Sequence, residues 1–114
     1  MTIEFLAKKL DLDILTSFEN ISSKIDGCYI GDLLSWVMAN AKEGNIWVTV
    51  MGNVNAVAVA VLTDVPCIIL AENALLDSDA KERAVQNGIV ILQSGKNAYE
   101  LAVMIHKLFS EEEK

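Results

Sequence analysis

The sequence predicts a single compact α/β domain with a mostly parallel sheet and crossover helices. From Asn45 onward, short β-branched runs alternate with segments of helical period. Two of these runs, residues 45–50 and 66–71, are apolar on consecutive positions, as strands covered on both faces are. The gap between them, about fifteen residues, fits a crossover helix and exceeds a hairpin turn.

Composition narrows the partners and the location. The chain has 114 residues, 53% of them hydrophobic, which is enough for one core. Nine basic and 16 acidic residues give a net charge of −7 without a Lys/Arg cluster, so we expect neither nucleic acid nor a membrane surface as a partner. The N-terminus does not resemble a secretory signal, which predicts a cytoplasmic protein. Cys28 and Cys67 form no CxxC pair and are predicted to be buried free thiols.

The first half of the chain predicts a helix, two short strands and a second helix. Thr2 is a suitable N-cap for a helix that buries Ile3, Leu6, Ala7 and Leu10. Residues 12–16 and 25–30 are predicted strands, with a polar loop at 17–23 between them. A second helix is expected from Asp32 to a C-terminal cap at Gly44, and its inward residues are Leu33, Leu34, Val37, Met38 and Ala41.

The segment after the strand at 45–50 decides the architecture. Residues 44–63 carry no formal charge and are about as long as a membrane span, but Asn45, Gly52, Asn53 and Asn55 interrupt the run. Residues 56–61 alternate Ala and Val, as a strand would. An N-cap at Asn53 or Asn55, worth about 1 kcal/mol, and a proline just past the end favour a helix instead. Its predicted face against the sheet is Val54, Val57, Val61 and Val65.

Two more helices and a strand complete the prediction. A helix is expected from Asp77 or Ser78 to a cap at Gly88, with Ala80, Ala84 and Val85 inward, followed by a strand at 89–92. A last helix begins near Asn97, which forms a capping box with Glu100. It is predicted to bury Ala98, Leu101, Ala102, Ile105 and Phe109, and residues 111–114 are predicted to be a solvated end.

Three loops follow strands and precede helices, at the edge where open α/β sheets bind ligands. We expect a binding site for a nucleotide or a phosphorylated metabolite there, with helix amides and the Lys96 ammonium facing the anion. Plain helix capping and turn formation is the alternative role for these residue types. The predicted site residues are Met51, Gly52, Asn53, Asn55, Ala71, Glu72, Asn73, Ser94, Gly95 and Lys96.

Catalytic signatures are missing from the sequence. Lys96 is followed by Asn97, so there is no GxxxxGK[ST] P-loop, and there is no GxGxxG motif either. His106, the only histidine, lies among core positions of the last helix and is predicted to be partly buried, so neither a metal site nor a catalytic triad is expected. Glu72 is the only carboxylate in the three loops. We therefore predict a protein that is not an enzyme and has no cofactor or metal.

Trp36 lies off the main apolar face of its predicted helix, between Leu33 and Asn40. Large aromatic residues that are exposed often anchor protein partners. Trp36 is therefore a candidate interface residue, with ordinary packing as the alternative.

The chain resembles the DRTGG domain, most closely its small stand-alone members and most strongly over residues 29–105. That family has a Gly-Asp-Arg turn, an Ala-rich helix, an Ile-Ile-Leu strand ending in Thr-Gly-Gly, and Ile-Leu-Ser before a last helix. These features fall here on residues 52–54, 56–62, 68–73 and 91–94. Of the name-giving residues only Gly52 is kept: Asn53 and Val54 replace Asp-Arg, and Ala71, Glu72 and Asn73 replace Thr-Gly-Gly.

The resemblance implies a fold like the N-terminal domain of HPr kinase/phosphorylase, and one DRTGG-like domain over residues 1–114. It also implies a non-catalytic regulatory or ligand-sensing module that acts as a homodimer. Loss of the arginine removes a residue suited to anion binding. The alternative is a docking or assembly subunit of a metabolic or redox enzyme complex that binds no ligand and contacts a partner enzyme. A thermal-shift screen against nucleotides and sugar phosphates distinguishes the two.

Overall fold

The computed structural model describes residues 1–16 and 18–112. Strands and helices alternate along the chain from residue 27 onward, as predicted. The elements in order are α1 (Ile3–Lys9), β1 (Asp13–Ile14), the 3-10 helix η1 (Phe18–Asn20), β2 (Gly27–Ile30), α2 (Leu34–Asn40), β3 (Asn45–Thr49), α3 (Val54–Thr63), β4 (Cys67–Leu70), α4 (Ser78–Asn87), β5 (Val90–Gln93) and α5 (Ala98–Glu112).

The strands form one sheet in the order β1-β5-β4-β3-β2. The strands β2 to β5 are parallel, whereas β1 pairs antiparallel with β5, so that Asp13 lies opposite Gln93. The predicted α/β domain with a mostly parallel sheet is therefore confirmed. The strand predicted at residues 12–16 is shorter than expected, because only Asp13 and Ile14 pair as a strand.

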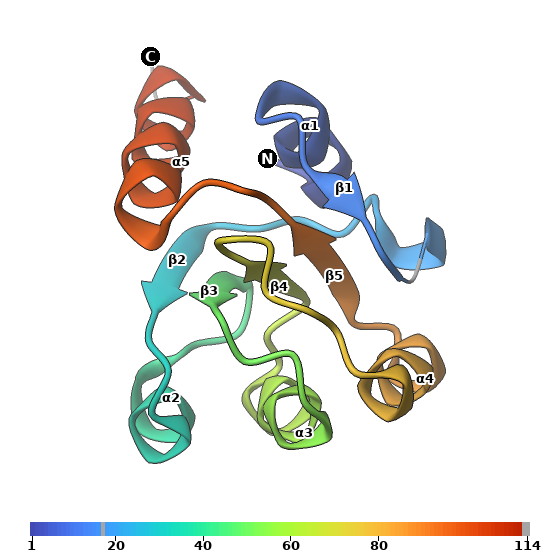
Figure 1. The fold of residues 1–114 in the computed structure, drawn as a ribbon. Coiled ribbons are helices and arrows are strands. Elements are labelled where there is room, and N and C mark those ends of the chain that lie inside the picture. Colours follow the sequence, from blue (N-terminus) through green and yellow to red (C-terminus); the bar gives the residue numbers. More distant parts are fainter. Residues whose placement is uncertain (17, 113–114) are drawn as a thin grey trace.

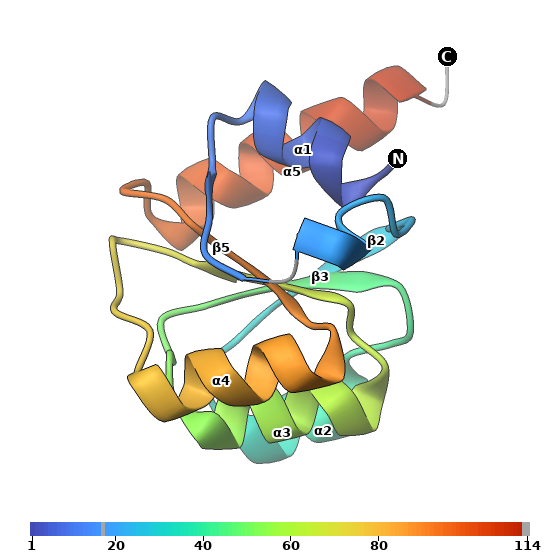
Figure 2. The ribbon, with the colours of Figure 1, turned by 90° about the vertical axis from the view of Figure 1, so that its right-hand side faces the viewer.

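Helices cover both faces of the sheet (Figures 1 and 2), with α1 and α5 on one face and α2, α3 and α4 on the other. Successive strand residues point to opposite faces, which divides the buried side chains into two clusters. Ile46 and Val48 belong to the cluster beneath α1 and α5. Trp47, between them, is buried in the cluster beneath α2, α3 and α4, and its indole Nε1 donates to the Gly31 carbonyl at 2.9 Å.

The segment that decides the architecture is a helix, as predicted. The Asn53 side chain accepts a hydrogen bond from the Ala56 amide at 2.9 Å and caps α3. The predicted inward face is partly wrong, because Val61 is 37% exposed and Val54 only half-buried, whereas Val57 and Val65 are buried. The small residues Ala56 and Ala60 take part of this face, since α3 approaches the sheet closely through them.

The second helix differs from its prediction at both ends. α2 begins at Leu34, because the Asp32 carboxylate is engaged elsewhere: it accepts from the Thr49 hydroxyl at 2.7 Å and the Val50 amide at 3.1 Å. The helix ends at Asn40, so Gly44, with φ of 83°, belongs to the turn before β3 and does not cap α2. Of the predicted inward residues, Leu33 and Met38 are exposed and only Val37 is fully buried.

The caps of the remaining helices agree with the sequence. Thr2 accepts from the Phe5 amide, and Gly88 ends α4 with φ of 70°. Asn97 and Glu100 form the predicted capping box, with reciprocal hydrogen bonds of 2.9 and 3.1 Å.

The predicted burial of two side chains on these helices is wrong. Val85 on α4 is exposed, and so is His106 on α5, because each lies on the side of its helix away from the sheet. The loop predicted at 17–23 contains η1. Ser17, Glu113 and Lys114 lie outside the described residues.

Candidate functional site

The three predicted loops lie along one edge of the sheet, where the parallel strands have their carboxyl ends. The Ala71 amide donates to the Thr49 carbonyl at 2.9 Å, and the Ser94 amide donates to the Leu70 carbonyl at 3.0 Å. These bonds continue the sheet past the last paired residues. The loop after β4 therefore lies between the other two.

Gly52, in the loop after β3, contacts the middle loop through its backbone. Its carbonyl accepts from the Asp77 amide at 2.8 Å. Its Cα lies so close to Leu75 that a Cβ at this position would overlap the Leu75 carbonyl oxygen. Glycine is required here for close approach of two backbone segments, although its φ is not in the left-handed region.

The loop after β5 is bonded to the middle loop from the other side. The Glu72 amide donates to the Lys96 carbonyl at 2.9 Å, and the Asn73 amide donates to the Ser94 carbonyl at 2.8 Å. Gly95 lies against the Asn73 side chain. The three loops thus form one continuous rim, which we define as residues 51–55, 71–77 and 93–97.

Glu72 and Asn73 both adopt left-handed backbone conformations, with φ of 56° and 55°. These are the two positions where the DRTGG pattern has Gly-Gly. The turn therefore has a conformation that glycine adopts freely, although a glutamate and an asparagine occupy it here. Asparagine tolerates this region better than glutamate, so we expect most of the strain at Glu72.

Replacing Glu72 with glycine is expected to stabilise the fold by about 0.5–1 kcal/mol. A non-glycine residue pays about 1–2 kcal/mol in this conformation, and the entropy that glycine loses on folding offsets part of the gain. The urea midpoint of Glu72→Gly should rise, while that of Glu72→Ala should not. A lower midpoint for the glycine variant would contradict left-handed strain at this position.

Backbone amides and one lysine are the groups of the rim that are suited to contact an anion. Asn53 satisfies the Ala56 amide, while the amides of Val54 and Asn55 precede the first helical hydrogen bond and point out of the helix end. Asn55 and Lys96 are exposed. Met51 is half-buried against the core cluster beneath α2, α3 and α4. Lys96 is the only basic residue of the rim.

Carboxylates surround that lysine more closely than the sequence indicated. A shallow hollow of about 470 Å³ is lined by Ser94, Gly95 and Lys96 together with Leu10, Asp11 and Glu100. Asp32 also lies at this edge through its bonds to Thr49 and Val50. Its place was missed because an aspartate before an apolar helical run is also typical of an N-cap.

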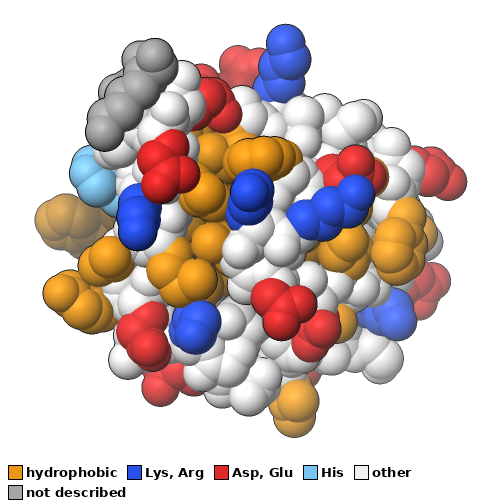
Figure 3. All heavy atoms as spheres, turned by 90° about the horizontal axis from the view of Figure 1, so that it is seen from above, with side chains coloured by type: hydrophobic (Ala, Val, Ile, Leu, Met, Phe, Trp, Pro, Cys, Tyr) orange, Lys and Arg blue, Asp and Glu red, His pale blue; other side chains and the backbone are white. Residues whose placement is uncertain are grey.

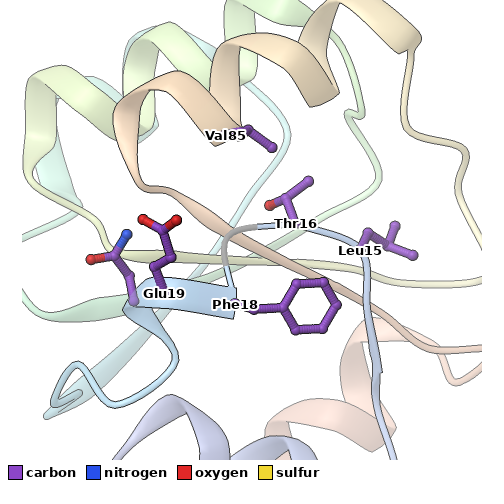
Figure 4. Close-up of a pocket in the computed structure, with 6 residues that line it drawn as sticks. Leu15, Thr16, Phe18, Glu19 and Val85 are labelled. Carbon is purple, nitrogen blue, oxygen red and sulfur yellow. The ribbon is translucent and has the colours of Figure 1, made fainter.

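A second hollow lies at the opposite edge, near the amino end of β5 (Figure 4). It measures about 260 Å³ and is lined by Leu15, Thr16, Phe18, Glu19, Asn20 and Val85. The Thr16 hydroxyl is already engaged, because it donates to the Ile89 carbonyl at 2.8 Å and accepts from the Ile91 amide at 3.0 Å. The sequence signal for this hollow was an aromatic residue, Phe18, in a segment predicted to be a polar loop. Its ring is exposed in the structure.

The two thiols are free, and neither is suited to nucleophilic chemistry at neutral pH. Burial raises the pKa of the Cys67 thiol far above its ordinary value, and a charge interaction with Cys28 raises it further. Cys67 is buried as predicted, whereas Cys28 on β2 is exposed, contrary to the prediction. Neighbouring atoms still shield the Cys28 sulfur from part of the solvent, and this desolvation raises the pKa of Cys28 to about 11.

Over residues 1–16 and 18–112, no three His, Cys, Asp or Glu side chains are grouped as a metal ion would require. None of the helices described is long and apolar enough to cross a bilayer.

Comparison with known proteins supports the fold. No protein family and no curated protein matches the sequence. Among solved structures, the chain is similar to the CBS and DRTGG domains of the regulatory region of Clostridium perfringens pyrophosphatase, complexed with the activator diadenosine tetraphosphate. The TM-score is 0.74 at 12% sequence identity, over 91% of this chain and 45% of that one. The likeness establishes the fold.

The chain therefore spans less than half the length of the structure that it matches. The resemblance of the sequence motifs to the DRTGG domain is supported at the level of a related α/β fold.

Proposed function

We propose that this protein is a regulatory module that binds a nucleotide or another phosphorylated metabolite without transforming it, and that it acts as a homodimer. The similar regulatory region of a pyrophosphatase was crystallised with a nucleotide activator, which supports a ligand of this class. The raised pKa values of both thiols and the lack of a P-loop sequence fit binding without turnover.

One observation carries the ligand-binding proposal: backbone hydrogen bonds join all three loops into a single rim. Gly52 is bonded to Asp77, and Asn73 is bonded to Ser94. The open amides at the start of α3 and the Lys96 ammonium therefore belong to one preorganised surface. A phosphate group placed there would gain charge-assisted hydrogen bonds with little loop ordering.

Replacing Lys96 with alanine is expected to weaken binding of the phosphorylated ligand about tenfold or more, because the rim loses its only positive charge. The measurement is calorimetric titration with ATP, AMP, diadenosine tetraphosphate and inorganic phosphate. For the wild type, a compound at 100 times its Kd should raise the free energy of unfolding by about 2.7 kcal/mol.

The matched control is Lys42→Ala. Lys42 is also exposed, but it lies before β3, at the amino-end edge of the sheet. Its loss should leave the affinity unchanged. Equal loss of affinity in both variants would reject the rim as the binding site and leave only a general effect of net charge.

A second function, a docking subunit that binds a partner enzyme of a metabolic or redox complex and no small ligand, is supported by Trp36. This side chain is 64% exposed, and Leu33 beside it is 61% exposed. The helix α2, which runs from Leu34 to Asn40 and includes Trp36, contains no charged residue. Such a surface fits the aromatic anchors of protein interfaces.

Tryptophan fluorescence can test this surface because Trp47, the other tryptophan, is fully buried. In a Trp47→Phe variant the emission reports Trp36 alone, and we expect it to be red-shifted and readily quenched by acrylamide. Docking of a purified partner enzyme should shift the emission to the blue and protect it from the quencher. An unchanged spectrum with a partner bound would place the interface elsewhere.

A further inference from the structure

The outer side of α5 carries a stripe of residues spaced as in a helix–helix seam. Tyr99 is 77% exposed, Val103 is 50% exposed, and His106 and Ser110 follow on the same side. The intervals are four, three and four residues. Three intervals over 11 residues are close to the 3.6 residues of one helical turn, so these side chains form one line along the helix that can face a second helix.

This stripe takes no part in the core of its own chain. The opposite side of α5 buries Leu101 and Ile105, and Met104 and Leu108 pack partly against the same cluster. In the view onto the face with α1 and α5 (Figure 3), hydrophobic side chains gather beside His106 at the margin of the molecule. Tyr99 and Val103 are thus exposed on a helix whose opposite side is already packed against the core.

We infer that the stripe is the docking surface for α5 of a second copy of this chain, with the two helices antiparallel about a two-fold axis. Antiparallel packing would place Val103 beside His106 of the second copy and Tyr99 beside its Ser110, so that large and small side chains alternate across the seam. A two-fold axis produces each contact twice. The seam extends along most of α5, a helix of 15 residues.

Charge complementarity identifies the occupant as a second copy. Glu100 and Lys107 are both exposed and flank the stripe on one side. In the antiparallel arrangement the Glu100 carboxylate lies across from the Lys107 ammonium of the second copy, and the reverse pair forms by symmetry. On the other flank lies half-buried Ala102, which adds apolar contact without repulsion, whereas Phe109 packs against the core of its own chain. The surface is therefore complementary to itself in both shape and charge.

The same comparison disfavours a parallel pair. A two-fold axis along parallel helices would bring the flank with Glu100 and Lys107 against the opposite flank of the second copy, where Ala102 lies, so neither charge would meet an opposite one. One helix pair with a short seam buries less than a standard interface, so we expect a Kd on the order of micromolar. This inference deepens the proposed function by giving its homodimer an interface.

The first test is sedimentation equilibrium of the wild type and of two matched variants. Val103→Glu should weaken dimerisation at least about tenfold, because a carboxylate would be buried in the seam. Val85→Glu is the control: Val85 is 54% exposed on α4, at a distance from the stripe in sequence and on the other face of the sheet. It should leave the dimer unchanged. A monomeric wild type, or equal effects of the two variants, would overturn the inference.

A charge exchange tests the antiparallel register without relying on that variant. Lys107→Glu places only acidic residues on the flank, and Glu100→Lys places only basic ones, so each variant alone should dimerise about tenfold more weakly. Mixed in equal amounts, they should form a heterodimer as tight as the wild type, because every pair is again complementary. Glu100→Lys retains the Asn97 cap of the helix. Failure of the mixture to recover dimerisation would reject the proposed pairing.

The outcome is separable from the ligand-binding proposal. Calorimetric titration of the Val103→Glu monomer with the same nucleotides measures the rim alone. If the wild type is monomeric and binds a nucleotide, the sensing function stands and this interface is rejected. A wild-type dimer that binds no nucleotide would keep the interface and reject the rim.

Discussion

Replacing Gly52 with alanine is expected to destabilise the protein by about 3 kcal/mol. A Cβ at this position would overlap the Leu75 carbonyl oxygen and lie 2.8 Å from the Leu75 carbonyl carbon and 3.0 Å from the Leu76 Cα. All three are backbone atoms, so no side-chain rotation relieves the clash. The middle loop would have to move, and the hydrogen bond between the Asp77 amide and the Gly52 carbonyl would be lost.

Urea unfolding with Gly95→Ala as the control measures this effect. A Cβ on Gly95 would lie 3.1 Å from the Asn73 amide nitrogen, which belongs to an exposed and movable side chain. We expect a cost below about 1 kcal/mol for this variant. If Gly52→Ala were equally mild, the contact between the loops after β3 and β4 would be looser than described, and the rim would not be preorganised.

Replacing Thr16 with valine is expected to cost about 3 kcal/mol although the two side chains have the same shape. Thr16 is 2% exposed. Its hydroxyl donates to the Ile89 carbonyl and accepts from the Ile91 amide. Valine would leave both backbone groups buried without a partner, and each costs about 1–3 kcal/mol when unsatisfied.

Thr63→Val is the control for this prediction. The Thr63 hydroxyl donates to the Val59 carbonyl at 2.8 Å, within the last turn of α3 and half-exposed. That carbonyl already accepts the backbone bond of the helix, so we expect a cost of about 0.5 kcal/mol or less. A similar loss for both variants in urea unfolding would show that the Thr16 bridge is no stronger than an ordinary helical back-bond.

Local capping signals explain why the sequence predicts most of the fold. The alternating Ala and Val residues at 56–61 favour a strand. Asn53 before them can cap a helix, and in the structure its side chain accepts a hydrogen bond from the Ala56 amide. The reciprocal bonds of Asn97 and Glu100 are another local signal. Because each cap involves residues three apart, no tertiary information is needed to recognise it.

Signals that depend on tertiary contacts were misread. Asp32 has the residue type of an N-cap, but its carboxylate bonds to Thr49 and Val50 of a neighbouring strand end, a partner that sequence spacing does not reveal. Val61 and Val85 were assigned inward from helical period alone. Both are exposed, because small residues such as Ala60 and Ala84 determine how closely α3 and α4 approach the sheet.

The position of the three candidate loops was predictable from the sequence, whereas their detailed structure was less so. Parallel strands bring the loops after β3, β4 and β5 to one edge, which follows from the fold class. The consecutive left-handed residues Glu72 and Asn73 could be suspected only from the glycines of a resembling family. The acidic surroundings of Lys96 come from Asp11 and Glu100 on other segments, and only the folded chain brings these together.

The pairing of β1 with β5 has a consequence for biosynthesis. Asp13 and Ile14 pair with Gln93 and Leu92. Most of the chain must therefore be synthesised before β1 can pair with β5. Until then Leu6 and Leu12, both buried in the finished domain, remain without their final neighbours. Closure of the sheet is thus a late event with a large loop to close, and nascent chains shorter than this are the ones that most need a chaperone.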